Sequence, residues 1–316
     1  MIGRLVSLFS RSKRAEVSVS MPRVPVRMHW FNGTTLAIAD WARIHQDFPA
    51  ELSGQAEHIY WTSAAREWLE ALNQQLGEHY CVRESADFLL LSNMYPRPAE
   101  VFLQTCQRML ARISRNLGAL AGDGVAGKYL VMVFDDPDEY YAYIGHYYPD
   151  GGEYAMSSGM FIQAGYGHFV MPLAEIDAME PVIAHELTHC LLQHLPIPAW
   201  LNEGLAVNTE HGLFPQLAAP QAQLYFPHEI AAQHAAYWNA ASIQTFWSGK
   251  SFLATDDGNR LSYDLAKSIT ALAAQDEPAF RAFVAAAQRD DGGLAAQQHL
   301  GYPLCNLLQA VLGDTR

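Results

Sequence analysis

The chain has 316 residues and a formal net charge of −13 at pH 7; half of its residues are hydrophobic and 17% are charged. This composition excludes disordered and fibrous proteins, and the length accommodates one large domain with extensions, or one large and one small domain. Residues 1–27 hold six basic side chains against one acidic (+5), which leaves −18 on the remainder. Because an acidic body repels phosphate backbones, we expect no nucleic-acid binding.

The N-terminal residues 1–25 predict a mobile basic arm that ends near two prolines. Its apolar run, Leu5 to Phe9, is shorter than the hydrophobic region of a secretory signal, and no small-residue cleavage site follows. We therefore expect no export, and no apolar stretch is long enough to span a membrane. The arm is interpreted as a solvated tail, with weak adhesion to a membrane surface through Leu5, Val6, Leu8 and Phe9 as the alternative.

Cysteine usage indicates the compartment. The four cysteines lie far apart and form no C-x-x-C pair. Widely spaced cysteines of this kind are typical of reduced, mostly buried thiols, so we expect a cytoplasmic protein without disulfides.

The residues between the arm and the clearest secondary-structure signals, 26–82, predict a lead-in segment packed on the main domain. Its most convincing feature is an amphipathic helix that Ser63 begins and Gly77 ends. No function can be assigned to this segment from its residues.

From residue 83 onward, strand and helix patterns alternate. The elements expected in chain order are a strand at 86–93, a helix at 97–118, a strand at 128–136, a helix at 137–148 and short strands at 158–165 and 167–174. Residues 178–316 show almost only helical patterns, broken by prolines and glycines. Strands followed by helices predict an α+β fold, in which a small mixed sheet with an edge strand precedes a mainly helical part.

The segment H-E-L-T-H at residues 185–189 is the first chemical signal. His185 and His189 are four residues apart, so on a helix they lie on one face and both rings can reach one metal ion. Glu186 points away from that ion but can reach a water bound to it, as in zinc hydrolases. The H-E-x-x-H pattern would occur by chance in about a few per cent of shuffled sequences of this composition. The pattern alone is therefore suggestive, and a third metal ligand nearby would strengthen it.

A second helix supplies that ligand. Pro181 is expected in the first turn of the histidine helix, which runs to about residue 194, and two prolines separate it from a helix over about 200–210. A catalytic zinc takes three protein ligands and one position for water. Glu203 lies fourteen residues after His189, beyond a turn short enough to fold the second helix back against the first. We therefore predict one Zn²⁺ bound by the two histidines and Glu203.

These segments resemble the gluzincin metallopeptidases. The H-E-L-T-H segment, followed by W-L-N-E-G-L-A at 200–206, is similar to the catalytic domain of the M1 aminopeptidases and to the shorter peptidase-MA-like domains. The resemblance covers roughly residues 85–312 and implies a metallopeptidase domain at 83–316 with a zincin-type helical subdomain. It implies that Glu203 is the third zinc ligand. It also implies that Tyr263, in Y-D-L-A-K-S, donates a hydrogen bond to the oxyanion.

Two departures limit what the resemblance implies. The G-x-M-E-N segment that binds a free amino terminus in the aminopeptidases is absent, and its nearest counterpart, G-E-Y-A-M-S-S-G-M-F at 152–161, has no acid in the required position. The spacing between His189 and Glu203 is also shorter, which favours the peptidase-MA-like group. Gluzincins keep an edge strand before the histidine helix, so a peptide is expected to pair with the strand at 167–174.

Several neighbouring residues have ordinary interpretations. Glu210 is read as an exposed carboxylate rather than as a partner of a ligating imidazole. Cys190 is read as a packed thiol. His228 and His234 are six residues apart and fall on nearly opposite helix faces, so they do not form a second metal motif. Histidines without partner spacing are His146, His168 and His194.

The sequence therefore predicts a zinc-dependent peptidase acting on a peptide or protein, with Glu186 as general base and Tyr263 as oxyanion donor. Three alternatives stay open. The chain is a metal-binding but non-proteolytic module, or a zinc hydrolase of a non-peptide amide or ester, or a structural protein in which H-E-L-T-H is coincidence.

Overall fold

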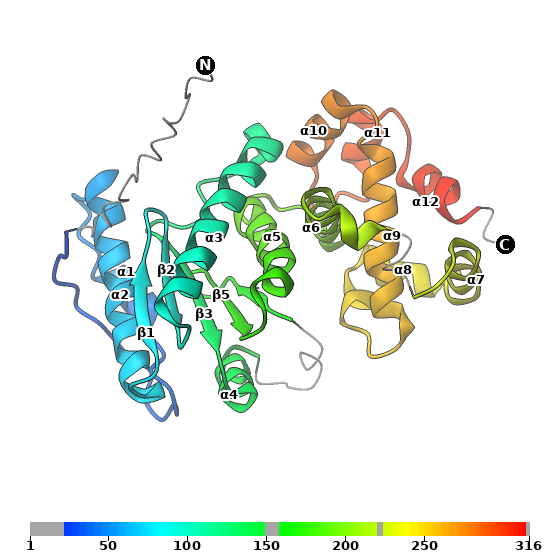
Figure 1. The fold of residues 1–316 in the computed structure, drawn as a ribbon. Helices are drawn as coiled ribbons and strands as arrows, with labels where there is room; N and C mark the ends of the chain where they lie inside the picture. The colour runs from blue at the N-terminus through cyan, green and yellow to red at the C-terminus, as the bar shows by residue number, and fades with distance from the viewer. Residues whose placement is uncertain (1–21, 149–157, 220–223, 314–316) are drawn as a thin grey trace, which may run out of the picture.

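The computed structural model describes residues 22–148, 158–219 and 224–313. Most of the predicted arm, including its membrane contact through Leu5 to Phe9, lies outside the described residues. One half of the described chain is a β-sheet with helices on both faces, and the other half consists of helices (Figure 1). This arrangement confirms the predicted α+β class.

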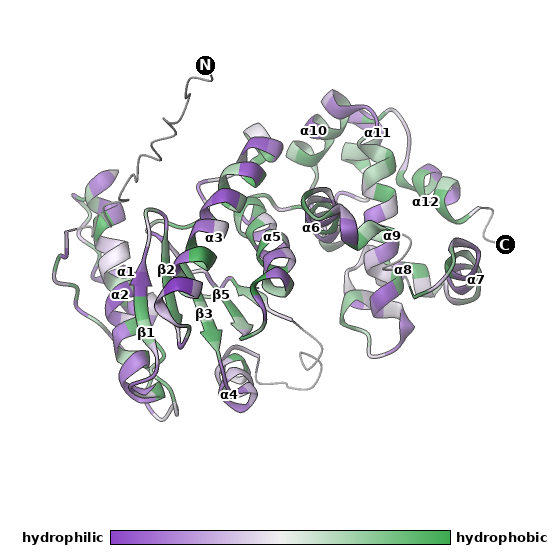
Figure 2. Cartoon of the chain, viewed as in Figure 1, coloured by the Kyte–Doolittle hydropathy of each residue, from purple (hydrophilic) through white to green (hydrophobic). Residues whose placement is uncertain are grey.

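A five-stranded mixed sheet forms the centre of the first half. In spatial order its strands are β1 (Cys81–Glu84), β2 (Phe88–Ser92), β3 (Tyr129–Phe134), β5 (His168–Pro172) and β4 (Met160–Ile162). The three inner strands are parallel, and β1 and β4 pair antiparallel at the two edges. β2 and β3 are hydrophobic (Figure 2) and buried along their whole length, as parallel strands covered on both faces must be.

The edge strand is not the one that the sequence predicted. The prediction placed the edge at residues 167–174, but β5 in that segment lies between β3 and β4. Leu130 of β3 pairs with His168 of β5, whereas β4 pairs only with β5. Both segments are short apolar runs, so their composition does not show which of them is adjacent to β3, and the edge prediction was wrong.

Helices cover both faces of the sheet. The helices on one face are α1 (Trp41–Gln46), α2 (Gln55–Leu76) and α4 (Pro137–Tyr147). Those on the other face are α3 (Pro96–Leu117) and α5 (Ile176–Leu192). The predicted lead-in segment thus supplies α1 and α2, and β1 spans the boundary that the sequence placed between residues 82 and 83.

Two helices begin earlier than predicted. α2 begins at Gln55 rather than Ser63, and the Ser63 hydroxyl donates to the carbonyl oxygen of Ile59 within the helix. α5 begins at Ile176, so Pro181 lies inside it rather than in its first turn. Pro181 removes one backbone donor from α5, and tertiary packing around this buried helix outweighs the loss.

The second half contains the remaining described α-helices. They are α6 (Ala199–Leu213), α7 (Pro227–Tyr237), α8 (Ser242–Trp247), α9 (Asp257–Ala273), α10 (Glu277–Ala286), α11 (Leu294–His299) and α12 (Leu304–Leu312). α6 packs against α5 on one side and against α9 on the other, so it joins the two halves.

A glycine sets the distance between α6 and α9. A Cβ atom on Gly204 would lie 2.1 Å from Oγ1 of Thr270 and 2.6 Å from the carbonyl oxygen of Ala266, so no larger residue fits. One turn further along α6, the Asn208 amide donates to the carbonyl oxygen of Lys267 at 2.9 Å. These contacts hold the second half of α9 directly against α6.

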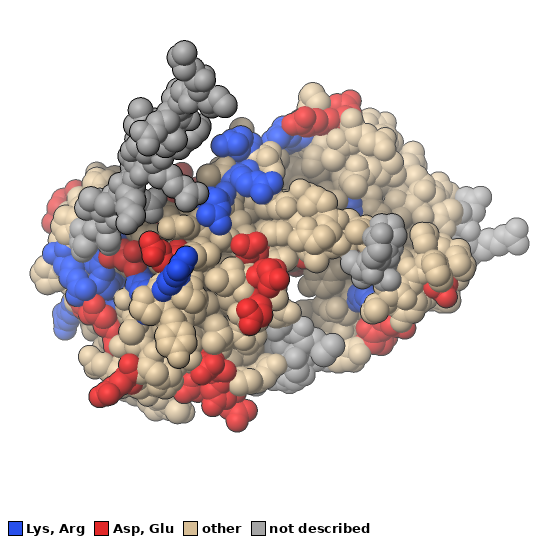
Figure 3. Space-filling model, viewed as in Figure 1, with Lys and Arg blue, Asp and Glu red and all other residues tan. Residues whose placement is uncertain are grey.

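Two surface properties bear on partners. No helix in the described ranges has both the length and the hydropathy needed to cross a lipid bilayer. On the face shown in Figure 3, Lys and Arg side chains form separate small groups, and the surface over the helical half is mostly uncharged. The described part of this face therefore lacks the continuous basic surface with which proteins follow a nucleic-acid backbone.

Candidate metal centre

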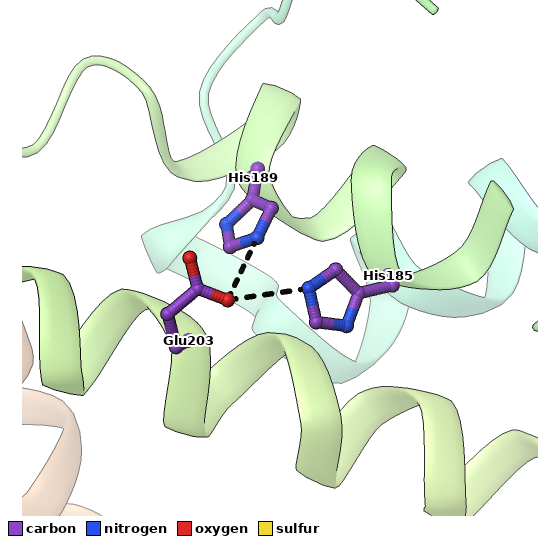
Figure 4. A group of neighbouring side chains, drawn as sticks. All are labelled: His185, His189 and Glu203. Carbon is purple, nitrogen blue, oxygen red and sulfur yellow. Dashed lines mark hydrogen bonds and ion pairs between the residues drawn. The ribbon is translucent and has the colours of Figure 1, made fainter. Parts of the chain in front are cut away.

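Two neighbouring helices bring the predicted ligands together (Figure 4). His185 and His189 lie one turn apart on α5, and Glu203 extends towards both from α6. One carboxylate oxygen of Glu203, Oε2, lies 3.3 Å from Nε2 of each histidine. The three ligand atoms all lie within 4.8 Å of one another.

The donor set and the two distances from Glu203 are of the kind that a tetrahedral zinc ion requires. Metal–ligand bonds of about 2.1 Å place two tetrahedral ligands about 3.4 Å apart. The two distances from the Glu203 oxygen, both 3.3 Å, are close to this value. Two imidazole nitrogens and one carboxylate oxygen also form a common ligand set of catalytic zinc. Within the described residues, no other His, Cys, Asp and Glu side chains form such a group of three.

Glu203 also forms ion pairs with the two histidines when their rings are protonated. Burial lowers the pKa of His185, but its contacts with Glu203 and Glu210 outweigh burial and raise this pKa to about 10. Burial raises the pKa of Glu203, and the positive His189 and His185 outweigh it and hold that pKa well below the usual range. Protons and zinc therefore compete for the same ring nitrogens.

Glu210 holds the ring of His185 from the side opposite to Glu203. Its Oε2 lies 3.2 Å from Nδ1 of His185, and its side chain is 23% exposed. The interpretation of Glu210 as an exposed carboxylate was therefore wrong. A carboxylate in this place fixes the orientation of the ring and keeps a hydrogen on Nδ1, which leaves Nε2 for a metal.

The second histidine is held differently. Nδ1 of His189 is buried and has no hydrogen-bond partner among the described residues, so the ring is held by packing and by the contact of its Nε2 with Glu203. Its neighbour Cys190 is completely buried among apolar side chains, and burial raises the pKa of the thiol far above its usual value. Cys190 is a packed thiol, as the sequence predicted, and not a fourth ligand.

Glu186 points towards the sheet. Its Oε2 accepts a hydrogen bond of 2.8 Å from the backbone N–H of Phe161 on β4. Burial raises the pKa of Glu186, and the positive charges of His185 and His189 oppose this. A carboxylate beside the ligands but not among them is suited to accept a proton from a metal-bound water. The sequence contained no signal for its contact with Phe161.

Tyr263 lies on α9, and its ring neighbours that of His185. The centroids of these two rings are 6.4 Å apart, and the Tyr263 ring also packs against Phe252, with 5.2 Å between centroids. Burial raises the pKa of the phenol, and the negative charges of Glu203 and Glu186 raise it further. The hydroxyl therefore keeps its hydrogen and can donate a hydrogen bond.

The histidines that the sequence set aside lie elsewhere. His228 is exposed, whereas His234 is buried on α7. Nδ1 of His234 accepts from the indole N–H of Trp238 at 2.9 Å, so its Nε2 carries the hydrogen and donates to Asp264, also at 2.9 Å. His234 thus links α7 to α9 and takes no part in the metal centre.

Comparison with known proteins gave no relative. No family model, no curated protein sequence and no solved structure matched the chain. The resemblance to the gluzincin metallopeptidases therefore rests on the sequence segments 185–189, 200–206 and 263–268 alone.

Proposed function

We propose that the chain is a zinc-dependent metallopeptidase. The observation that supports this most strongly is the approach of three donor atoms, from His185, His189 and Glu203, to within 4.8 Å of one another. A zinc ion held by them would polarise a scissile carbonyl and lower the pKa of its bound water to about 7. Glu186 and Tyr263 lie beside these ligands, where a base and an oxyanion donor are required.

Each of the remaining residues has its own task in this proposal. Glu186 accepts a proton from the attacking water and passes it to the leaving amine. Tyr263 donates a hydrogen bond to the oxyanion, and removing such a donor typically raises the barrier by about 3 to 4 kcal/mol. Glu210 keeps the His185 ring in its ligating orientation.

The open edge of the sheet provides a place for an extended substrate. β4 has β5 on one side and no strand on the other among the described residues. A peptide can add to such an edge by backbone hydrogen bonds, which bind it with little choice of sequence. Of the four cysteines, Cys106 and Cys190 are buried and Cys81 and Cys305 are exposed, so the expectation of mostly buried thiols holds for half of them. The cytoplasmic location stays part of this proposal.

Metal analysis together with cleavage of a proteome-derived peptide pool tests the proposal. We expect one equivalent of zinc per chain and peptide cleavage by the wild type. Glu186→Gln should keep the zinc and lose cleavage by 10²-fold or more. Absence of stoichiometric zinc, or equal cleavage by Glu186→Gln and wild type, would contradict the proposal.

The same experiment separates the alternatives. A chain that binds zinc and cleaves no peptide is a metal-binding module. A chain that turns over only non-peptide amides or esters is a different zinc hydrolase, and mass spectrometry of the products from mixed substrates identifies it.

A further inference from the structure

The backbone N–H of Phe161 faces the side of β4 on which the described residues place no further strand. It donates to Glu186 and therefore points away from β5. Successive residues of an antiparallel strand alternate between facing the partner strand and facing away from it, so Met160 and Ile162 direct their backbone groups towards β5. In this three-residue strand, Phe161 is thus the residue whose N–H and C=O are turned outward.

Two close contacts hold Phe161 next to Glu186. A Cβ atom on Gly159 would lie 2.8 Å from Cγ1 of Val182, so the glycine lets β4 approach α5. Val182 and Glu186 are four residues apart and lie on the same face of α5, the face that meets β4. On the strand, the ring of Phe161 packs against Phe169 with 5.0 Å between centroids. The hydrogen bond between Phe161 and Glu186 is therefore supported by packing at both ends.

A peptide that adds to β4 requires the same donor. Strand addition pairs a carbonyl oxygen of the incoming chain with an outward-facing N–H of the edge strand. Phe161 offers one such hydrogen, and Glu186 already accepts it. The carboxylate and the peptide therefore compete for a single donor.

We propose that Phe161 is a positioning residue that couples peptide binding to the release of Glu186. This inference rests on the proposed peptidase function, because it takes a peptide as the ligand. In the free chain, the N–H of Phe161 holds the carboxylate against the edge strand. A peptide that pairs with β4 takes over this N–H, and Glu186 becomes free to act as a base beside the ligands. Glu186 is then held against the edge strand only while no substrate occupies the edge.

Amide exchange in the metal-free chain tests the starting contact. With ¹⁵N-labelled phenylalanine, the Phe161 amide should exchange slowly for an edge-strand position, because Glu186 protects it. Glu186→Ala should accelerate this exchange by tenfold or more and leave that of Phe169, on the inner strand, unchanged. Equal exchange rates of the Phe161 amide in the two proteins would overturn the inference.

Peptide titration of the metal-free chain tests the competition without turnover. The probe is a mixture of capped hexapeptides of randomised sequence, and the readout is the chemical shift of the Phe161 amide. We expect Glu186→Ala to bind the mixture roughly tenfold more tightly than the wild type, because no charged acceptor must be displaced. Glu186→Gln keeps an acceptor oxygen without the charge, so its peptide affinity should lie between those of the wild type and Glu186→Ala.

Two substitutions of Phe161 form a matched pair. Phe161→Pro removes the N–H but no hydrogen bond of the sheet, since proline is tolerated where an edge N–H faces outward. Phe161→Leu removes the ring and keeps the N–H. Glu186→Ala should tighten binding in the Phe161→Leu background and have no effect in the Phe161→Pro background. If Phe161→Pro does not fold, the peptide affinities of the wild type, Glu186→Gln and Glu186→Ala decide whether the competition exists.

Failure of this inference differs from failure of the peptidase proposal. If the chain cleaves peptides but binds the hexapeptide mixture equally with and without the Glu186 carboxylate, the peptidase function is supported and the coupling is refuted. Absence of binding to both the wild type and Glu186→Ala at millimolar peptide also overturns the coupling. If the peptide affinity depends on Glu186 but the chain cleaves no peptide, the peptidase function is refuted and the competition for the Phe161 N–H is supported.

Discussion

Glu203 and Glu210 bond opposite nitrogens of one imidazole ring, that of His185. They are seven residues apart, so two turns of α6 bring them to the same helix face. The sequence contains this spacing, and it is the signal that could have paired Glu210 with the metal centre. It does not show whether the shared face turns towards α5 or towards solvent.

We expect Glu210→Ala to weaken zinc binding about 10- to 100-fold, because the His185 ring loses the carboxylate that orients it. Competition with a chromophoric zinc chelator measures this affinity. Glu210→Gln should lose less, since its amide oxygen still accepts from Nδ1. Equal zinc affinity of Glu210→Ala and wild type would show that the contact does not orient the ligand.

His168 shows how a buried histidine is satisfied without a metal. Its Nδ1 donates to the carbonyl oxygen of Tyr166 at 2.7 Å, and its Nε2 accepts from the Tyr143 hydroxyl at 2.8 Å. Burial lowers the pKa of His168 to about 4, against a smaller upward effect of the Tyr166 carbonyl. The neutral ring thus uses both nitrogens in the core that α2 and α4 form with the sheet.

The low pKa of His168 predicts acid sensitivity. Above about pH 6.5, the ring is neutral in both the folded and the unfolded state, and its contribution to stability is complete. Between pH 6.5 and 4 only the unfolded state takes up the proton, so the free energy of unfolding falls, by about 3 kcal/mol at most. We expect His168→Gln to reduce this slope in urea unfolding. The exposed-site control His228→Gln should retain the wild-type slope, and an unchanged slope in His168→Gln would refute the assignment.

At the scale of elements, α6 places the site. It carries Glu203 and Glu210 on the face that meets α5, and Gly204 on the face that meets α9. The close contact at Gly204 is also what brings Tyr263 of α9 near His185. Gly204 is therefore a packing residue that holds α9, and with it Tyr263, against α6.

Gly204→Ala should destabilise the protein by about 1 to 3 kcal/mol, because the added methyl group overlaps Thr270 and Ala266 of α9. Gly212→Ala is the matched control on the same helix, since a Cβ atom there meets nothing within 4 Å. That change should leave stability equal or raise it by up to about 1 kcal/mol. Thermal unfolding of both variants gives the comparison, and equal stability of the two would contradict tight packing at Gly204.

At the scale of the whole molecule, the candidate centre lies where the sheet half meets the helical half (Figure 1). α5 packs on the sheet, α6 packs on α5, and α9 packs on α6. The opposite face of the sheet depends on α2, whose Trp68, Leu69 and Leu72 are completely buried. Residues 26–82 therefore form part of the same folded unit as the sheet that supports the site.

Removal of residues 1–82 should prevent folding, because it uncovers the sheet face that contains Leu89, Leu130 and Met132. Removal of residues 1–21, within the segment that the sequence predicts to be a solvated arm, is the control and should leave thermal unfolding unchanged. Solubility and circular dichroism of the two truncated chains measure the difference. A soluble chain of residues 83–316 with cooperative unfolding would show that the lead-in segment is a separate addition.

The sequence by itself determined what depends on local spacing. The four-residue interval between His185 and His189 defines one helix face, and the prolines before Trp200 define the turn that returns Glu203 to it. The α+β order of elements also follows from local hydrophobic patterns, which need no knowledge of distant contacts. For this reason the histidine pair and the general architecture could be predicted.

Only the tertiary structure decided which strand forms the edge, which way Glu210 turns and what Glu186 contacts. Each of these depends on residues distant in the chain: β5 is adjacent to β3, α6 lies against α5, and the N–H of Phe161 lies 2.8 Å from Glu186. A backbone N–H is present at every residue except proline, so no residue type marks the one that will bind the Glu186 carboxylate. Packing between elements selects it, and composition and periodicity do not record that packing.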